Sequence, residues 1–281
     1  MFMQTNYVIS ITINILIYNL NILLIVLYML IEFIPRGRLG NAIFRYFACS
    51  LFCIKYNYTY KLSIKSNEKQ FTEKDFIKWM KNNYNPHKSL SLNHFYQHDI
   101  ILIKNIEDIL NFINLHPEHR IETDRNESYY IKDVITTPPN FSKIYNTVIH
   151  IRLEDFVKYN LVIPCSKIIE LFESIDTLNE SCCIVCAQLT TNYEKDYIKQ
   201  ISDYIIKKFN IKTILESNDV ITDLNIMKMA TTLICSTSTL SWSAALLSST
   251  ISTCYFPNYI KKRDHESTFI KPIDNTILYD I

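Results

Sequence analysis

The stretch "DLNIMKMATTLICSTSTLSWSAALLSSTISTCYFP", residues 223–257, decides the fold class. It reads as a helix, the short apolar run "LICS", a second helix and the apolar run "STCYFP". Short, almost wholly apolar strands that alternate with helices are typical of a parallel sheet covered on both faces. The stretch therefore predicts an α/β fold with a doubly wound parallel sheet.

The same alternation continues toward the N-terminus. Further strands are predicted at "TVIHIRL", "CCIVCA" and "KTILES", and helices at "CSKIIELFESI" and "EKDYIKQISDYIIKKF". We therefore expect a C-terminal Rossmann-like half over residues 144–281, with its sheet at about 144–260 and a short tail after it. The double proline in "TTPPNFSK", residues 136–143, is typical of a linker and marks where this half begins.

Residues 31–143 are expected to form an N-terminal α/β half. The run "YMLIEFIPR" predicts a strand, a turn with Gly37 and Gly40 follows, and apolar residues then recur at helical spacing. The chain has only 2 glycines, and both lie in this turn. The polar middle, about 56–135, contains two helical pieces, "TEKDFIKWMKNNY" and "NIEDILNFINL".

Residues 1–30 form a hydrophobic N-terminal segment without a charged residue. About 20 apolar residues span a bilayer, so residues 7–28 are a candidate membrane anchor. The alternative is a hydrophobic extension packed on the fold, which Asn14, Asn19 and Asn21 within residues 7–28 favour. Because Arg36 and Arg38 follow the segment, the positive-inside tendency would keep the rest of the chain cytoplasmic.

Composition excludes several classes of protein. A net charge of +1 argues against a nucleic-acid-binding surface, and 48% hydrophobic with 20% charged residues argues against disorder or a multi-span membrane protein. The 8 cysteines lie mostly in apolar runs, which indicates free buried thiols and a reducing compartment. No metal ligand is predicted, because the "CIVC" pair has no matching second pair.

Three stretches place polar residues where such a fold binds ligands. "VIHIRLEDF" puts His150, Arg152 and Asp155 at the carboxyl end of a strand, where ligands of these sheets bind. The glycine turn and the hydroxyl cluster "STST", 236–239, each precede a helix, whose first amides can bind an anion. The alternatives are a salt bridge for Arg152, a core imidazole for His150, a plain turn and a plain N-cap.

Together the three stretches resemble the GDP-fucose-dependent fucosyltransferases. "GRLGNAIFRYFA" is similar to their glycine–Asn motif, "HIRLED" to their His-x-Arg-x-x-Asp motif, and residues 223–247 to their final donor motif. The ending "STLSWSAALL" is closest to the α-1,2-fucosyltransferase branch (galactoside 2-alpha-L-fucosyltransferases, glycosyltransferase family 11-like). The resemblance implies two Rossmann-like halves facing across a cleft, the GT-B arrangement.

The resemblance also implies roles for individual residues. Arg152 matches the arginine that holds the β-phosphate of the leaving GDP. His150 and Asp223 match positions that contact guanine. The remaining matches concern the diphosphate: Ser238 and Thr239 on one side, and the loop with Gly37, Gly40 and Asn41 on the other.

The expected activity is an inverting, metal-independent transfer of fucose from GDP-fucose to a glycan acceptor. No Asp-x-Asp motif occurs in the chain, so Arg152 and helix-start amides would neutralise the leaving group. Glu154 and Asp155 are the candidate general bases.

The chain departs from the α-1,2 branch at several positions, namely Arg38, Ala42, Leu153, Ala187–Gln188 and Trp242–Ser243. These departures leave two alternatives: a different donor sugar, or a degenerate member that binds a nucleotide sugar or glycan without turnover. Trp242 itself is expected in the core.

Overall fold

The main element of the computed structural model is a parallel sheet, which lies within the described residues 30–33, 37–56, 59–62, 103–178, 181–258 and 271–281. Its strands pair in the order β10-β9-β8-β5-β6-β7, and every pair is parallel. The strands are β5 (Thr147–His150), β6 (Cys182–Val185), β7 (Thr213–Glu216), β8 (Thr232–Ile234), β9 (Thr253–Asn258) and β10 (Thr276–Asp280).

The strand order is that of a Rossmann-like sheet. The first strand, β5, lies in the centre, the next two follow on one side, and the last three on the other. The crossover helices are α8 (Cys165–Glu173), α9 (Asn192–Phe209), α10 (Val220–Lys228) and α11 (Thr239–Leu247), and the short α7 (Glu154–Lys158) follows β5. The predicted doubly wound sheet is confirmed for this part of the chain.

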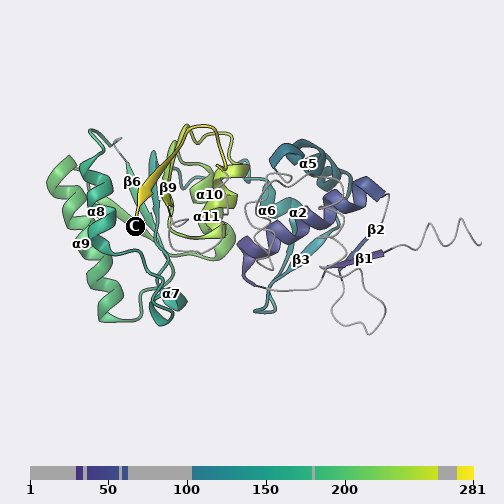
Figure 1. Ribbon diagram of the computed structural model, residues 1–281, viewed down its shortest axis with the longest axis horizontal. Helices are drawn as coiled ribbons and strands as arrows, with labels where there is room; N and C mark the ends of the chain where they lie inside the picture. The colour runs from purple at the N-terminus through teal and green to yellow at the C-terminus, as the bar shows by residue number, and fades with distance from the viewer. Residues whose placement is uncertain (1–29, 34–36, 57–58, 63–102, 179–180, 259–270) are drawn as a thin grey trace, which may run out of the picture.

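Both faces of the central strands β5, β6 and β8 are covered, which explains why these strands are almost wholly apolar. Val148 and Leu233 belong to the core beneath α10 and α11, whereas Ile149 and Ile234 belong to the core beneath α8 and α9 (Figure 1). All eight cysteines are free and six are buried, as the sequence predicts.

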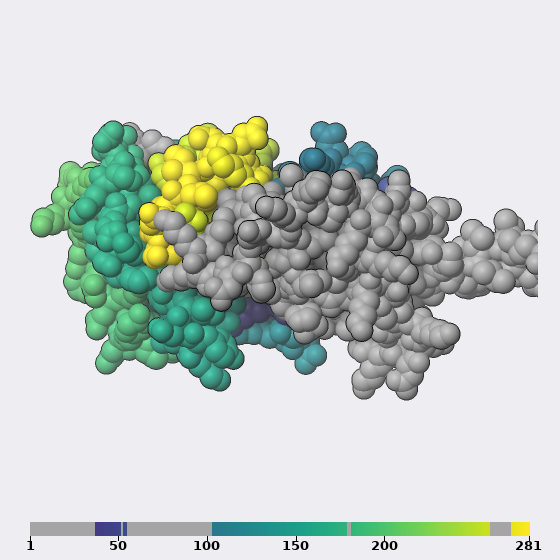
Figure 2. All heavy atoms as spheres, in the orientation of Figure 1, coloured from purple at the N-terminus to yellow at the C-terminus, as the bar shows by residue number. Residues whose placement is uncertain are grey.

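The C-terminal segment differs from the predicted tail, because β10 extends the sheet as an edge strand beside β9. Thr276 and Tyr279 point inward, and the Tyr279 hydroxyl donates to the Cys235 carbonyl at 2.6 Å. Ile277 and Leu278 stay exposed, and the segment forms part of one face of the molecule (yellow in Figure 2). No helix was predicted between β9 and this segment, so the alternation of strands and helices did not point to a further strand.

The N-terminal region begins with the predicted strand, turn and helix. β1 (Leu30–Phe33) and β2 (Thr59–Leu62) pair in parallel, and α2 (Leu39–Tyr56) connects them. The predicted helix at 105–115 is α5 (Ile106–Leu115). The hairpin of β3 (Arg120–Glu122) and β4 (Ser128–Tyr130) and the short α6 (Ile131–Ile135) were not predicted.

Two predictions fall on residues outside the described ranges, namely the hydrophobic segment 7–28 and the helix at "TEKDFIKWMKNNY". Within the described ranges, no helix combines the length and the apolar character needed to cross a membrane.

Helix α2 packs directly against α11 (Figure 1). The rings of Phe44 and Trp242 lie 4.8 Å apart, and both side chains are at most 1% exposed. Burying aromatic side chains of this size contributes roughly 1.5–3 kcal/mol each. Residues of α2 and of the sheet therefore share one hydrophobic core across the predicted boundary at 144, and Trp242 is a core residue as predicted.

The two glycines are required for different structural reasons. Gly37 has a φ of 79°, in the left-handed region that glycine tolerates without cost. Gly40 lies where α2 meets the start of α11: a Cβ there would be 2.5 Å from the Leu240 amide nitrogen and 2.6 Å from Thr239 Oγ1. Close packing of two helix starts therefore requires Gly40.

We expect the substitution Gly40→Ala to destabilise the protein by about 1–3 kcal/mol, because the added methyl group must push the backbone of α11 away. The free energy of unfolding in urea measures this effect. Gly37→Asn serves as the comparison, since asparagine adopts positive φ more readily than other residues, and should cost less. Equal losses for the two variants would contradict the role assigned to the α2–α11 contact.

Candidate functional site

A pocket of about 300 Å³ lies at the carboxyl end of the sheet. It adjoins His150 at the end of β5 and Val185 at the end of β6. β5 and β8 are the neighbours at which the strand order reverses, the place where open α/β sheets bind ligands. Most residues singled out from the sequence line it: Gly40, His150, Arg152, Glu154, Asp223, Ser238 and Thr239.

Three predicted residues, Gly37, Asn41 and Asp155, are not part of the pocket lining. The Gly37 carbonyl accepts from the Asp124 amide at 3.1 Å. The Asn41 side chain accepts from the Thr239 hydroxyl at 3.0 Å, so Asn41 holds α2 to α11. Two residues that were expected to approach a diphosphate from opposite sides therefore bind each other.

His150 connects the ends of the two strands at the reversal. Its Nδ1 lies 3.0 Å from Ser236 Oγ, just after β8, and the side chain is buried. Burial, with a smaller effect of the Arg152 charge, lowers the pKa of His150 to about 3. The imidazole is therefore neutral over the physiological range, and it can offer one N–H and one lone pair.

Arg152 is held in a fixed orientation beside the pocket. Its Nη2 and Nε donate to the two carboxylate oxygens of Asp155 at 2.9 and 3.3 Å, and its guanidinium stacks on Phe156 at 4.4 Å. A guanidinium has five N–H donors, so this contact occupies one edge of the group. The salt bridge weighed as an alternative for Arg152 is present.

A second arginine, Arg38, reaches the same acidic turn from the N-terminal region. It forms an ion pair with Glu154, and its Nη2 lies 3.6 Å from Asp155. Burial works to raise the pKa of Asp155, but the hydrogen bond and charge of Arg152 and the charge of Arg38 lower it below its ordinary value. Asp155 therefore stays ionised and positions both arginines, and a carboxylate of low pKa is a weak general base.

Glu154 has a φ of 31°, a conformation that side-chain-bearing residues rarely adopt. It is the first residue of α7 and lines the pocket itself. Strained backbone of this kind persists where surrounding contacts hold it, and the ion pair with Arg38 is one such contact.

The opposite wall of the pocket is the start of α11. The Ser238 hydroxyl accepts from the Leu240 amide at 3.2 Å and so caps the helix. The plain N-cap that was weighed for this stretch is therefore present. Ser238 and Thr239 also line the pocket, where the positive end of the helix dipole favours an anion.

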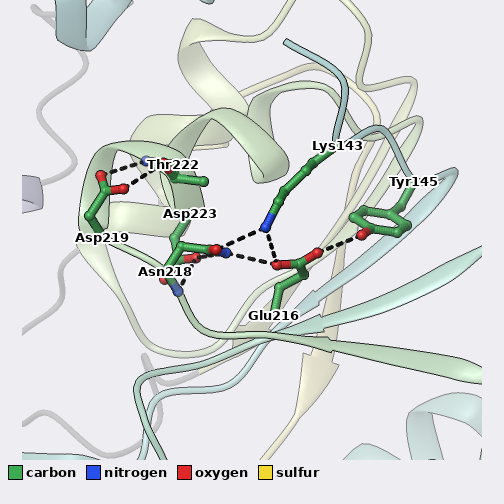
Figure 3. Close-up of polar contacts among 7 residues, drawn as sticks. All are labelled: Lys143, Tyr145, Glu216, Asn218, Asp219, Thr222 and Asp223. Carbon is green, nitrogen blue, oxygen red and sulfur yellow. Dashed lines mark hydrogen bonds and ion pairs between the residues drawn. The ribbon is translucent and has the colours of Figure 1, made fainter.

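A third wall is formed by the end of β7 and the start of α10, whose polar contacts Figure 3 displays. Glu216 accepts from Lys143 Nζ at 2.7 Å, from Tyr145 OH at 2.6 Å and from Asn218 Nδ2 at 2.9 Å. Asn218 in turn donates to Asp223 through both its backbone and its side chain, at 3.2 and 3.1 Å. Lys143, the last residue of the predicted linker, is thus tied to the pocket wall.

The two aspartates of this wall have opposite electrostatic environments. Burial raises the pKa of Asp223 to about 6, against the hydrogen bonds from Asn218. Asp219 caps α10 by accepting from the amides of Ile221 and Thr222 at 3.0 Å each. Burial works to raise the pKa of Asp219, but the Thr222 hydroxyl and these amides lower it.

Several residues of the pocket were not predicted as site residues. Those with charged, amide or hydroxyl side chains are Arg38, Arg125, Glu127, Tyr129, Asn218 and Asp219. Asn218 and Asp219 follow a predicted strand, so their place at the carboxyl end of the sheet was a usable signal. Arg125, Glu127 and Tyr129 lie on the β3–β4 hairpin, and without that hairpin nothing in the sequence brings them to the sheet.

We expect Asp223→Asn and Asp219→Asn to change stability in opposite directions at pH 8. Because the folded pKa of Asp223 lies above the ordinary value of 3.8, its ionisation costs stability as the pH rises from about 4 to 6. Asp223→Asn removes this cost. The variant should therefore have a higher free energy of unfolding than the wild type at pH 8, but no such advantage near pH 4.

The folded pKa of Asp219 lies below its ordinary value, so the ionised carboxylate stabilises the folded protein above about pH 4. This stabilisation is lost as the pH falls and the carboxylate becomes protonated. Asp219→Asn should therefore lower stability at pH 8 and converge with the wild type in acid. Urea unfolding at about pH 3, below the ordinary aspartate pKa, and at pH 8 measures both variants. A shift of the same sign for both at pH 8 would contradict the environment described for Asp223.

Comparison with known proteins adds no further constraint on this site. No protein-family model matches the chain. No curated protein matches it either. The function must therefore be argued from the pocket and from the three motifs that line it.

Proposed function

We propose that this protein is a glycosyltransferase that binds the diphosphate of a nucleotide sugar in the pocket, with GDP-fucose as the donor. One observation carries the proposal: Arg152 and the start of α11 line the same pocket at the point where the strand order reverses. An oriented guanidinium and a helix N-terminus are the two groups by which proteins most often bind phosphate without a metal. The choice of GDP-fucose rests on the motif resemblance.

The leaving group explains why such a pocket would serve transfer. Breaking the bond between the sugar C1 and the phosphate oxygen places negative charge on the diphosphate. Arg152, held by Asp155, and the amides at the start of α11 are already oriented before the reaction, so little reorganisation is needed to stabilise that charge. The transfer would therefore proceed without added Mg²⁺ or Mn²⁺.

For the acceptor hydroxyl, Glu154 is the better candidate general base of the two that were predicted. Glu154 lines the pocket, whereas Asp155 does not, and the two arginines keep Asp155 ionised. The Arg38–Glu154 ion pair would have to loosen when the donor binds. A diphosphate offers Arg38 a competing partner, which favours that exchange.

The GT-B arrangement of two facing halves belongs to the same proposal. Arg38 and Gly40 of the N-terminal region line the pocket together with residues of the C-terminal sheet. A donor bound there would contact both parts of the chain. By resemblance the guanine would lie near His150 and Asp223, and a glycan hydroxyl would approach on the side of Arg38.

A second candidate function is binding of a nucleotide sugar without turnover. The observation that favours it is that Arg38 and Arg152 both pair with acidic residues of the α7 turn. If those pairs persist with the ligand bound, the arginines contribute binding but little stabilisation of a leaving group.

Release of GDP from GDP-fucose, without added divalent metal, tests the proposal in the full chain. We expect slow release by the wild type and a loss of roughly 10²–10³ in rate for Arg152→Ala, with a much smaller loss of donor affinity. Arg120→Ala is the matched control, because Arg120 contacts Ser128 and Tyr130 and is not part of the pocket lining.

The remaining outcomes separate the candidates. Tight donor binding without GDP release, even with a panel of glycan acceptors, would favour the binding protein. Equal rates of GDP release for the wild type and Arg152→Ala would contradict the proposed role of Arg152 in stabilising the leaving group. No binding of any GDP-, UDP- or CMP-sugar would exclude both functions.

A further inference from the structure

We propose a zinc-binding site at the turn between α5 and β3, with His116, Glu118 and His119 as ligands. Each side chain offers one ligand atom, and these atoms all lie within 4.8 Å of one another. Two imidazoles and one carboxylate are a ligand set that proteins use for Zn²⁺, with a water as fourth ligand. The site lies apart from the pocket, so zinc binding there does not depend on the proposed function.

The backbone brings the ligands together before any metal binds. The His119 amide donates to the His116 carbonyl at 3.1 Å, which closes a four-residue turn. Pro117 stands at the second position of this turn, where its fixed φ is favourable. The His116 amide donates to Ile113, so the turn continues directly from the last residues of α5. Little conformational entropy would be lost when a metal binds.

The distances already approach those of a tetrahedral site. Glu118 Oε1 lies 3.4 Å from His116 Nδ1 and 3.7 Å from His119 Nε2. Zinc–ligand bonds of about 2.0–2.2 Å at tetrahedral angles place neighbouring ligand atoms roughly 3.3 Å apart. The two imidazole rings are stacked, with 4.7 Å between centroids and 4° between planes, so their lone pairs do not yet converge. The half-exposed His116 ring must turn out of this stack, and the exposed Glu118 must rotate, to bring the three atoms onto one ion.

A buried hydroxyl orients the third ligand. Tyr46 OH, on α2, lies 2.9 Å from His119 Nδ1, and the tyrosine is fully buried. When Nδ1 carries the proton and donates it to this hydroxyl, Nε2 presents its lone pair to the metal. Ligating histidines almost always have such a partner at the other ring nitrogen. Phe112 packs against both imidazole rings.

The site would add a link between three elements that already share one hydrophobic core. α5 supplies His116 at its end, β3 begins directly after His119, and α2 supplies Tyr46. The β3–β4 hairpin carries Arg125 and Glu127 to the pocket. Bound zinc would thus stabilise the base of that hairpin without contacting the pocket.

Zinc titration of the chelator-treated full chain, in competition with a chromogenic zinc indicator, tests the proposal. We expect one site in the wild type that weakens at least about tenfold in His116→Ala and Glu118→Gln. Both side chains are partly or largely exposed, so these variants should keep their fold, which circular dichroism checks. Tyr46→Phe should weaken zinc by about 10–100-fold while all three ligands remain.

Glu107→Gln, an exposed carboxylate on α5, is the matched control and should bind zinc like the wild type. The melting temperature should rise with zinc in the wild type and in Glu107→Gln, but not in His116→Ala. Two results would overturn the proposal: a wild type that binds no zinc, or zinc affinity that is unchanged in both His116→Ala and Glu118→Gln. The second would place the zinc on other groups, such as the thiols.

Discussion

The pairing of β5 with β8 in the centre of the sheet is the constraint on which the rest of the site depends. The chain leaves β5 toward β6 and leaves β8 toward β9, on opposite sides of this pair. The polar residues that follow β5 and β8 therefore meet at the carboxyl edge of the sheet. The hydrogen bond between His150 and Ser236 closes this edge. Because the pKa of His150 is low, the contact is between neutral groups and does not change with pH in the physiological range.

Around this edge, charge is arranged so that one acidic residue serves two cations. Asp155 contacts Arg152 and lies near Arg38, although the arginines come from different parts of the chain. Such pairs contribute little to stability at a partly exposed surface, since solvent screens them. Their effect is on geometry: two flexible side chains are held facing the same pocket.

Much of the C-terminal half could be predicted from the sequence, because strands buried on both faces have almost only apolar residues. β10 was missed, although like the predicted edge strand β7 it has two exposed apolar side chains, because no helix was predicted between β9 and β10 to continue the alternation. The site was predicted where side chains directly follow a strand, as at His150 and Arg152. It was missed where the residues arrive by tertiary packing, as with Arg125 on an unpredicted hairpin.

The contact at Gly40 also has a consequence for how this protein can evolve. Every amino acid other than glycine has a Cβ, so no conservative replacement exists at this position. Every single-base change in a glycine codon that alters the amino acid introduces a side chain at the junction of α2 and α11. A chain with 2 glycines in 281 residues thus depends on one of them for bringing Arg38 to the pocket. A substitution at Gly40 must therefore be accompanied by a shift of α11, and because the start of α11 forms a wall of the site, the pocket would change as well.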